Sequence, residues 1–378
     1  MRVTRLRVLG FRNLRDSELE PGPGITLLWG PNGAGKTNLL EALFTGLAGR
    51  SCRTRNDRET IAFDESLARV EVDVSDEIEE RTFLWSFARD GERRHLLDGS
   101  AVTPELADRR PPLAVFLPDR LALVKGPPAV RRSHVDRLLG ALWPSRADAR
   151  RRYGRALAQR NALLGRVRAG IASQDSLDAW DIELAAAGSD LMDARRDAVA
   201  TMAPEFAAAA TDLGLRDGAL LRYMPRSDAG SAEDLAAELA ERREGDVERG
   251  YSGHGPHLDD IDLLLDDRSV RRYGSQGEQR SSLLALLFAE RRALLEARRT
   301  PPLMLLDDVM SELDPARRDL LASRLAEGDG QTLITATEAA HLPVGRERVE
   351  IAVRRGAAES RATAGVDTSP AVRTAFAA

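Results

Sequence analysis

The segment Gly30-Pro31-Asn32-Gly33-Ala34-Gly35-Lys36-Thr37 has the form G-x-x-x-x-G-K-[ST] and lies between an apolar run and a helical pattern. Only glycine lets a chain bend tightly enough to aim several backbone N–H groups at phosphate oxygens without a Cβ clash. In such a loop Lys36 would reach the β- and γ-phosphates of a nucleotide, and the Thr37 hydroxyl would bind Mg²⁺. All eight residues are therefore predicted to bind a nucleoside triphosphate, with Lys36 also serving catalysis.

Patterns of the expected kind flank this loop. Ile25 to Trp29 is apolar and predicts the strand before the loop, whereas Asn38 to Leu47 has leucines at helical spacing. The helix N-terminus would add a partial positive charge at the phosphate site. A glycine-rich turn without a ligand is the alternative, and this context argues against it.

Length and composition set the broad class. With 378 residues, 43% of them hydrophobic, the chain is expected to form two lobes or one domain with a large insertion. No run approaches 20 apolar residues and the N-terminus lacks the core of a signal peptide, so we expect no membrane association and a cytoplasmic location. The net charge of −5 means that any nucleic-acid binding relies on local basic patches.

Composition along the chain predicts an α/β protein with an inserted helical part. Residues 1–118 combine strands and turns with the phosphate loop, 119–250 are rich in alanine, leucine and arginine at helical periodicity, and strands resume within 251–356. The segment 357–378 is small, polar and aperiodic, and we expect it to be disordered. Sustained heptads are missing, so no long coiled coil is expected. The expected strands are 3–9, 25–29, 68–74, 81–87, 113–116, 258–265, 303–306 and 331–335.

A second motif ends an apolar strand with two acids, Asp307 and Asp308. A buried parallel strand of this kind delivers carboxylates to the phosphate loop. Asp307 would hold Mg²⁺, and Asp308 would act as the catalytic residue that orients or deprotonates the attacking water. Paired acids that cap the following helix are the alternative.

Two further motifs resemble those of ABC-type ATPases. Ser275-Gln276-Gly277-Glu278 begins the helix that leads to the acidic strand, where its N–H groups and hydroxyl could contact the γ-phosphate of a nucleotide held by a second subunit. A plain helix cap is the alternative for this segment. Ser311-Glu312-Leu313-Asp314 matches the loop that crosses the dimer interface in these enzymes. The four signature residues and Asp314 are therefore predicted to complete the nucleotide site in a homodimer.

With these motifs in order, nearly the whole chain resembles the RecF family, the bacterial recombination-repair branch of the SMC-like ABC ATPases. The segments that carry the resemblance, beside the four motifs, are Leu9-Gly10-Phe11-Arg12-Asn13-Leu14, Phe116-Leu117-Pro118-Asp119-Arg120-Leu121, Lys125-Gly126-Pro127-Pro128, Arg131-Arg132 and Gly255-Pro256-His257-Leu258-Asp259-Asp260. The resemblance implies an ATPase head whose lobe I, a mixed sheet with helices, carries an inserted helical lobe II.

The resemblance also implies a function. It implies ATP and Mg²⁺ as cofactors, an ATP-dependent homodimer, and binding to double-stranded DNA beside single-stranded gaps. RecO and RecR are the implied partners in loading RecA, in DNA replication, repair and the SOS response. A transporter nucleotide-binding subunit, a structural SMC-type clamp and a small-molecule P-loop kinase are the alternatives.

The chain departs from the family pattern at several positions. Leu258 replaces a common arginine, Glu278 replaces a frequent glutamine, and Asp308 is one methylene shorter than the glutamate usual in ABC transporters. The shorter reach predicts slow hydrolysis, and we expect a weak ATPase activity that DNA stimulates. An arginine set could form a DNA-facing stripe or a plain solvated helix face. Its members are Arg131, Arg132, Arg150, Arg151, Arg152 and Arg155.

Overall fold

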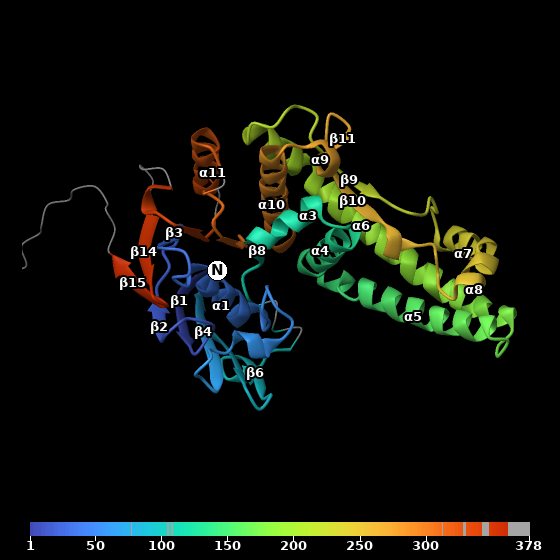
Figure 1. The fold of residues 1–378 in the computed structure, drawn as a ribbon, viewed down its shortest axis with the longest axis horizontal. Helices are drawn as coiled ribbons and strands as arrows, with labels where there is room; N and C mark the ends of the chain where they lie inside the picture. The colour runs from blue at the N-terminus through green and yellow to red at the C-terminus, as the bar shows by residue number, and fades with distance from the viewer. Residues whose placement is uncertain are drawn as a thin grey trace, which may run out of the picture. The chain divides into compact units, whose positions relative to one another are not determined.

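The computed structural model describes residues 1–76, 78–103, 106, 109–311, 313–327, 330–341 and 348–361 (Figure 1). The chain divides into two compact units. The first draws on Met1–Arg110, Leu305–Glu312 and Ala322–Ala378, and the second on Pro111–Met304 and Leu313–Leu321.

An antiparallel sheet in the first unit has the strand order β2-β1-β4-β5-β6-β7. Its strands are β1 (Arg2–Leu9), β2 (Ser17–Leu19), β4 (Leu67–Ser75), β5 (Glu80–Ala88), β6 (Arg93–Leu97) and β7 (Ser100–Ala101). Along β4 the side chains of Ala68, Val70, Val72 and Val74 are buried. This spacing of two places them on one face of the sheet, as in an antiparallel sheet with one covered side.

The second sheet of this unit carries the phosphate loop. The strands that this unit contributes to it follow the order β15-β14-β3-β13-β12, with β3 parallel to both β13 and β14. The strands are β3 (Ile25–Trp29), β12 (Leu303–Leu306), β13 (Thr332–Ala336), β14 (Arg348–Arg354) and β15 (Ala357–Arg361). β12 and β13 are buried along their whole length. Continuous apolar runs of this kind are typical of parallel strands covered on both faces.

Helix α1 (Lys36–Ala48) packs against both sheets, through β4 and β5 on one and β13 on the other. Gly46 permits the close approach, since a Cβ built on it would lie 2.6 Å from Cγ2 of Val72. Gln331 also joins the two sheets. Its amide accepts from the Val3 N–H at 2.8 Å and donates to the Val3 and Gly22 carbonyls at 2.8 and 2.7 Å. The helix that starts at the phosphate loop is thus fixed between two sheets.

The second unit is mainly helical. Its helices are α3 (Ala122–Lys125), α4 (Pro128–Leu142), α5 (Ala149–Arg168), α6 (Asp178–Asp212), α7 (Ala232–Glu241), α8 (Arg243–Arg249), α9 (Val270–Tyr273) and α10 (Gln276–Arg298), while α11 (Pro315–Glu327) begins here and ends in the first unit. The 35-residue α6 packs against α4, α5, α7 and α10, and α5 runs beside it in Figure 1. The apolar faces of these helices are covered by one another within the unit.

Short strands complete this unit. A three-stranded antiparallel sheet has the order β11-β10-β9, formed by β9 (Leu220–Met224), β10 (Asp260–Leu265) and β11 (Arg268–Ser269). β8 (Leu113–Phe116) contacts α10, and the N–H of Leu303, at the start of β12, donates to the Pro112 carbonyl at 2.8 Å. α9 follows β11 directly and leads into α10, which carries the serine-glycine motif at its start.

The α/β class and all eight expected strands are confirmed, and none of these strands is displaced by more than two residues at either end. The helical character of 119–250 is interrupted by β9, whose pairing with β10 was not expected. The expected disorder from residue 357 is wrong for Ala357–Arg361, because these residues pair with β14 as β15. The rest of that segment, 362–378, lies outside the described residues. The unit boundaries also differ from the expected divisions at 118 and 250, because α10 and β10 pack on α6, α4 and β9.

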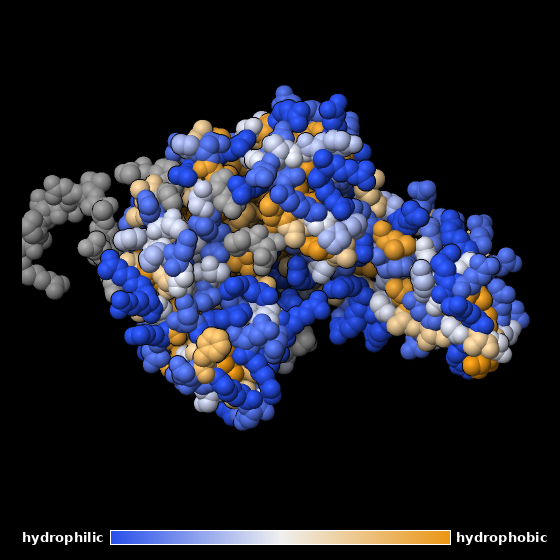
Figure 2. Space-filling view, viewed as in Figure 1, coloured by the Kyte–Doolittle hydropathy of each residue, from blue (hydrophilic) through white to orange (hydrophobic). Residues whose placement is uncertain are grey.

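Among the described residues, no helix combines the length and the apolar character needed to cross a membrane. The face in Figure 2 is largely hydrophilic, with scattered small apolar patches.

Candidate nucleotide site

The phosphate loop connects β3 to α1 in a backbone conformation that requires glycine. Gly30, Gly33 and Gly35 have positive φ angles of 157°, 77° and 110°. A Cβ on Gly30 would lie 2.2 Å from the Val353 carbonyl oxygen, and one on Gly35 would lie 2.7 Å from Cδ2 of Leu14. Nothing lies within 4 Å of a Cβ built on Gly33, so the space beside it is open. Backbone N–H groups in such a loop can approach a phosphate closely.

Lys36, the first residue of α1, folds back over its own loop. Its Nζ donates to the Gly30 carbonyl at 2.7 Å and to the Pro31 carbonyl at 3.1 Å. Burial lowers the pKa of this ammonium group, while the charges of Asp308 and Asp307 oppose the shift. The lysine is thus held at the loop that a triphosphate would occupy.

The acids at the end of β12 meet the start of α1. Thr37 Oγ1 lies 2.9 and 2.8 Å from the two carboxylate oxygens of Asp307. Thr335, within β13, donates from Oγ1 to Asp307 Oδ1 at 2.7 Å and accepts the Asp308 N–H at 2.8 Å. The two residues predicted to hold Mg²⁺ therefore lie together, and a third residue fixes both acids.

Burial and mutual repulsion both disfavour the charged form of Asp307. Burial raises the pKa of Asp307 above its ordinary value, hydrogen bonds from Thr335 and Thr37 oppose the shift, and the neighbouring Asp308 adds to it. Asp308 has a left-handed φ of 50°, and its Oδ1 is buried with no donor among the described residues. Oxygen ligands of this kind suit Mg²⁺. The hydroxyl and the carboxylates therefore fit the ion.

A buried carboxylate on α1 organises a second layer of polar groups. Glu41 is fully buried and accepts from Arg12 at 2.8 and 3.1 Å, from Arg53 at 3.0 Å and from Ser51 Oγ at 2.6 Å. The charge of Arg53 also opposes the raised pKa of Asp307. None of these contacts was predicted from the sequence. The available signal was Glu41 itself, an acidic residue at an inward position of an otherwise apolar helix face.

The N-terminal segment that carried the family resemblance contacts the loop. Asn13 donates from Nδ2 to the Gly33 carbonyl at 2.9 Å, and Asn38 donates to Asn13 Oδ1 at 2.7 Å. Asn13 follows β1, so the antiparallel sheet helps to hold the phosphate loop in place.

Ser275 to Glu278, which we call the signature corner, lies in the second unit. Ser275 caps α10 in a reciprocal capping box, in which its Oγ accepts the Glu278 N–H at 3.2 Å and the Glu278 carboxylate accepts the Ser275 N–H at 2.7 Å. Arg216 donates to Glu278 at 3.0 Å. Arg317 lies beside Gly277, where its Nη1 would be 2.9 Å from a Cβ. The motif thus caps α10 and is surrounded by charged groups.

Asp314 precedes α11 and contacts Arg317, the α11 residue that lies beside the signature corner. Its Oδ1 accepts the Arg317 N–H at 3.0 Å, and its Oδ2 lies 3.4 Å from Nη1 of Arg317. Asp314 thereby orients the arginine that stands against Gly277. Glu312, in the same motif, lies outside the described residues.

The segment around His257 forms a structural junction. Its Nδ1 lies 2.6 Å from the Tyr153 hydroxyl and its Nε2 lies 3.0 Å from the Ser252 carbonyl oxygen. Burial lowers the pKa of His257 and raises that of Tyr153, so the hydroxyl stays protonated and donates to a neutral imidazole. Asp259 accepts from Arg195 at 3.0 Å. These contacts tie α5 and α6 to the start of β10.

The proposed arginine stripe is not a single surface. Arg131 is buried and pairs with Asp260 in bidentate fashion at 2.7 and 2.8 Å, and Arg132 donates to the Asp259 carbonyl at 2.6 Å. These two arginines therefore hold α4 to β10 and are not directed at a ligand. The four on α5 are exposed, and three of them face a carboxylate: Arg150 with Asp136, Arg151 with Asp148 and Arg152 with Asp190.

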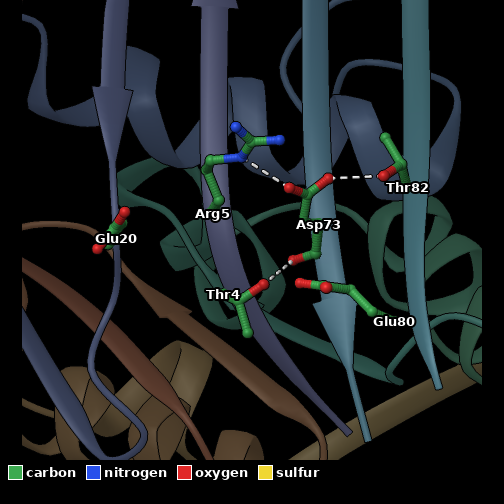
Figure 3. A pocket seen from close by; sticks show the side chains of 6 residues that line it. All are labelled: Thr4, Arg5, Glu20, Asp73, Glu80 and Thr82. Carbon is green, nitrogen blue, oxygen red and sulfur yellow. Dashed lines mark hydrogen bonds and ion pairs between the residues drawn. The ribbon is translucent and has the colours of Figure 1, made fainter.

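A surface pocket of about 650 Å³ on the antiparallel sheet is a poor site for phosphate. Figure 3 shows Asp73 between Arg5 and Thr82, which donate to it at 2.6 and 2.8 Å. The carboxylates of Glu20 and Glu80 line the same pocket. Three carboxylates against one guanidinium would repel an anion, so the phosphate loop remains the candidate nucleotide site.

Comparisons with known proteins agree with the geometry. The model of the RecF/RecN/SMC N terminal domain family matches residues 2–359. The DNA replication and repair protein RecF of Heliobacterium modesticaldum is 36% identical over 347 residues, which cover 89% of this chain and 92% of that protein. RecF of Anaeromyxobacter dehalogenans (strain 2CP-C) is 39% identical over 351 residues, covering 89% and 93%.

Solved structures extend the likeness to three dimensions. The structure of the recombination mediator protein RecF with ATP in the RecFOR pathway superposes with a TM-score of 0.83 at 25% identity, covering 96% of this chain and 98% of that one. An Smc head bound to the C-winged helix domain of ScpA superposes with a TM-score of 0.58 at 16% identity over 95% and 96%, which shows a shared fold. The predicted ABC-type ATPase head is thereby confirmed, and the chain belongs to the RecF family.

Proposed function

We propose that this chain is an ATP-dependent DNA-binding protein of DNA replication and recombinational repair, acting in the RecFOR pathway. The observation that carries the proposal is the meeting of Lys36, Thr37 and Asp307 at a glycine loop, in a chain that matches RecF proteins over about nine tenths of its length. Membership of this ATPase family implies ATP hydrolysis. A transporter subunit and a small-molecule kinase are not favoured, because the relatives named above are DNA repair proteins.

The residues of the site have separable roles in this proposal. The N–H groups of Gly30 to Thr37 bind the phosphates, and Lys36 exchanges the carbonyls of its own loop for β- and γ-phosphate oxygens. Thr37 and Asp307 would hold Mg²⁺, which supplies charge neutralisation at the phosphates when bound. Asp308 orients or deprotonates the attacking water, and its short side chain makes turnover slow. The resulting weak ATPase activity is stimulated by DNA.

ATP closes two copies of the chain into a dimer in this proposal. The Ser275 hydroxyl and the N–H groups at the start of α10 in one copy cover the γ-phosphate held by the phosphate loop of the other. Hydrolysis removes that phosphate and opens the dimer. A population shift from 1:99 to 99:1 requires about 5.5 kcal/mol of differential affinity, which two nucleotides can share.

The closed dimer binds double-stranded DNA beside single-stranded gaps and acts in the cytoplasm with RecO and RecR in loading RecA, including during the SOS response. The relatives' names and the RecFOR structures support the pathway. Because DNA contacts would be mainly to phosphates, affinity should fall steeply as salt is raised.

Sedimentation velocity with Mg²⁺-ATP and gapped DNA tests the proposal. Asp308→Asn should trap a species of twice the 41.3 kDa chain mass and bind DNA tightly, whereas Lys36→Met should remain a monomer. Lys125→Met is the matched control, because Lys125 is the other lysine of the chain and is exposed on α3. A monomeric Asp308→Asn protein that shows no nucleotide-dependent DNA binding would refute the proposal.

A further inference from the structure

The signature corner already contains an anion. The Glu278 carboxylate accepts the Ser275 N–H at 2.7 Å and the Arg216 guanidinium at 3.0 Å, while the Glu278 N–H donates to Ser275 Oγ at 3.2 Å. The Ser275 N–H and Oγ are thereby both engaged within the corner. In the proposed dimer, these are the two groups of Ser275 that would contact the γ-phosphate held by the second copy.

The groups around the Glu278 carboxylate are charged and partly exposed, so its ion pair can be exchanged for another anion. Arg216 is 57% exposed and lies 3.4 Å from a second acid, Asp266. On the other side, Arg317 lies so close to Gly277 that a Cβ there would be 2.9 Å from its Nη1. The two guanidinium groups and the helix N-terminus are all positive, and the carboxylates of Asp266, Asp314 and Glu278 offset them. Of these three acids, Glu278 is the one that accepts the Ser275 N–H in the single chain.

We propose that Glu278 is an electrostatic gate on nucleotide-driven dimerisation: its carboxylate holds the place of the partner's γ-phosphate, and Arg216 sets how strongly it opposes closure. This inference rests on the proposed ATP-gated dimer. A γ-phosphate that enters the corner meets the negative charge of Glu278 directly, so closure proceeds only as far as Arg216 and Arg317 neutralise both anions. The dimer is therefore weaker than the phosphate contacts alone would make it.

The substitution Glu278→Gln isolates this charge. Glutamine at the third helical position retains the reciprocal capping box, so α10 should remain capped. In water, the repulsion between two like unit charges at contact distance changes an equilibrium constant about fivefold. Each dimer closes two signature corners, so this factor applies twice. We therefore expect the dissociation constant of the nucleotide-bound dimer to fall about 30-fold. Arg216→Gln should raise it by a similar factor of about 30, because the carboxylate at each of the two corners loses its counter-charge.

Sedimentation equilibrium of the full chain with Mg²⁺ and the slowly hydrolysed analogue ATPγS measures this constant. Glu296→Gln is the matched control, since Glu296 lies on the same helix and pairs with Arg292 at 2.7 Å, away from the corner. Urea unfolding of each variant checks that the fold is kept. Repetition in raised salt should shrink the Glu278 effect and leave the control unchanged.

The outcomes separate the gate from the dimer. A tighter Glu278→Gln dimer, a weaker Arg216→Gln dimer and an unchanged Glu296→Gln dimer support the gate. If wild-type protein dimerises with ATPγS and Glu278→Gln dimerises equally or more weakly, the gate is wrong while the ATP-dependent dimer stands. If no variant dimerises with nucleotide at any concentration, the proposed dimer is wrong and the gate is wrong with it.

Discussion

Replacing Thr335 with valine keeps the shape of a fully buried side chain and removes the hydroxyl that joins the two acids. That hydroxyl donates to Asp307 at 2.7 Å and accepts the Asp308 N–H at 2.8 Å. An N–H left buried without an acceptor costs about 1–3 kcal/mol, and a lost hydrogen bond to a charged group about 1.5–3 kcal/mol. The added methyl group recovers about 1 kcal/mol. The free energy of unfolding should therefore fall by about 3 kcal/mol.

The same change should weaken nucleotide binding. Asp307 would lose one of the two side-chain hydrogen bonds that stabilise its charged form, so its pKa should rise further and its orientation toward Thr37 should loosen. Loss of a group that orients a metal ligand typically lowers metal affinity by about 10- to 100-fold. We expect a loss of this size in the Mg²⁺-dependent affinity for ATP.

Urea denaturation followed by circular dichroism measures the first effect, and isothermal titration calorimetry with and without Mg²⁺ measures the second. Thr335→Ser is the matched control, because it keeps the hydroxyl and loses only a methyl group, for about 1 kcal/mol. If valine and serine at this position gave the same stability and the same affinity, the bridging role of the hydroxyl would be refuted.

Three further predictions, tested with four substitutions, concern other parts of the structure. Arg131→Ala should lower the free energy of unfolding by about 3–5 kcal/mol, since it leaves the Asp260 carboxylate without its buried partner; a change confined to the salt dependence of DNA binding would instead assign Arg131 to DNA. Burial lowers the pKa of His257 in the folded protein, so the neutral ring contributes stability above about pH 6.5, the pKa of histidine in the unfolded chain. This stability is lost as the pH falls from there toward the lower pKa of the folded state. The free energy of unfolding, measured with urea, should therefore decrease on acidification. His257→Gln should flatten that dependence, and an unchanged profile would contradict the assignment. Gly46→Ala should lower the thermal midpoint through about 1–3 kcal/mol of overpacking against β4. Gly154→Ala on α5, with nothing within 4 Å of the new Cβ, should raise the thermal midpoint through about 1 kcal/mol of helix propensity. If both alanine variants shifted the midpoint equally, the difference in packing between the two glycines would be refuted.

The sequence predicted what local chemistry determines. The phosphate loop, its flanking strand and helix, and the strand before Asp307 each carry their signal within a few consecutive residues, and all lie where expected. The partners of those residues could not be predicted in the same way. Thr335 reaches Asp307 because β13 and β12 are neighbours in the sheet, a register that no local pattern of residues encodes.

Elements stabilised by distant pairing were missed for the same reason. Leu220–Met224 has no alternation strong enough to contrast with its helical surroundings, and its strand conformation follows from pairing with β10. Ala357–Arg361 has a small, polar composition that predicted disorder, yet its backbone pairs with β14. The burial of Arg131 also depends on Asp260, which lies 129 residues away in the chain.

The resting position of Lys36 affects how its variants are interpreted. In the protein without nucleotide, its ammonium group braces two carbonyls of its own loop. A methionine at this position would remove the brace together with the phosphate ligand, so the empty protein would itself be altered. Hydrogen–deuterium exchange across residues 30–35 of nucleotide-free Lys36→Met should therefore be faster than in the wild type. A phenotype of that variant then reflects both a less ordered phosphate loop and the loss of nucleotide binding.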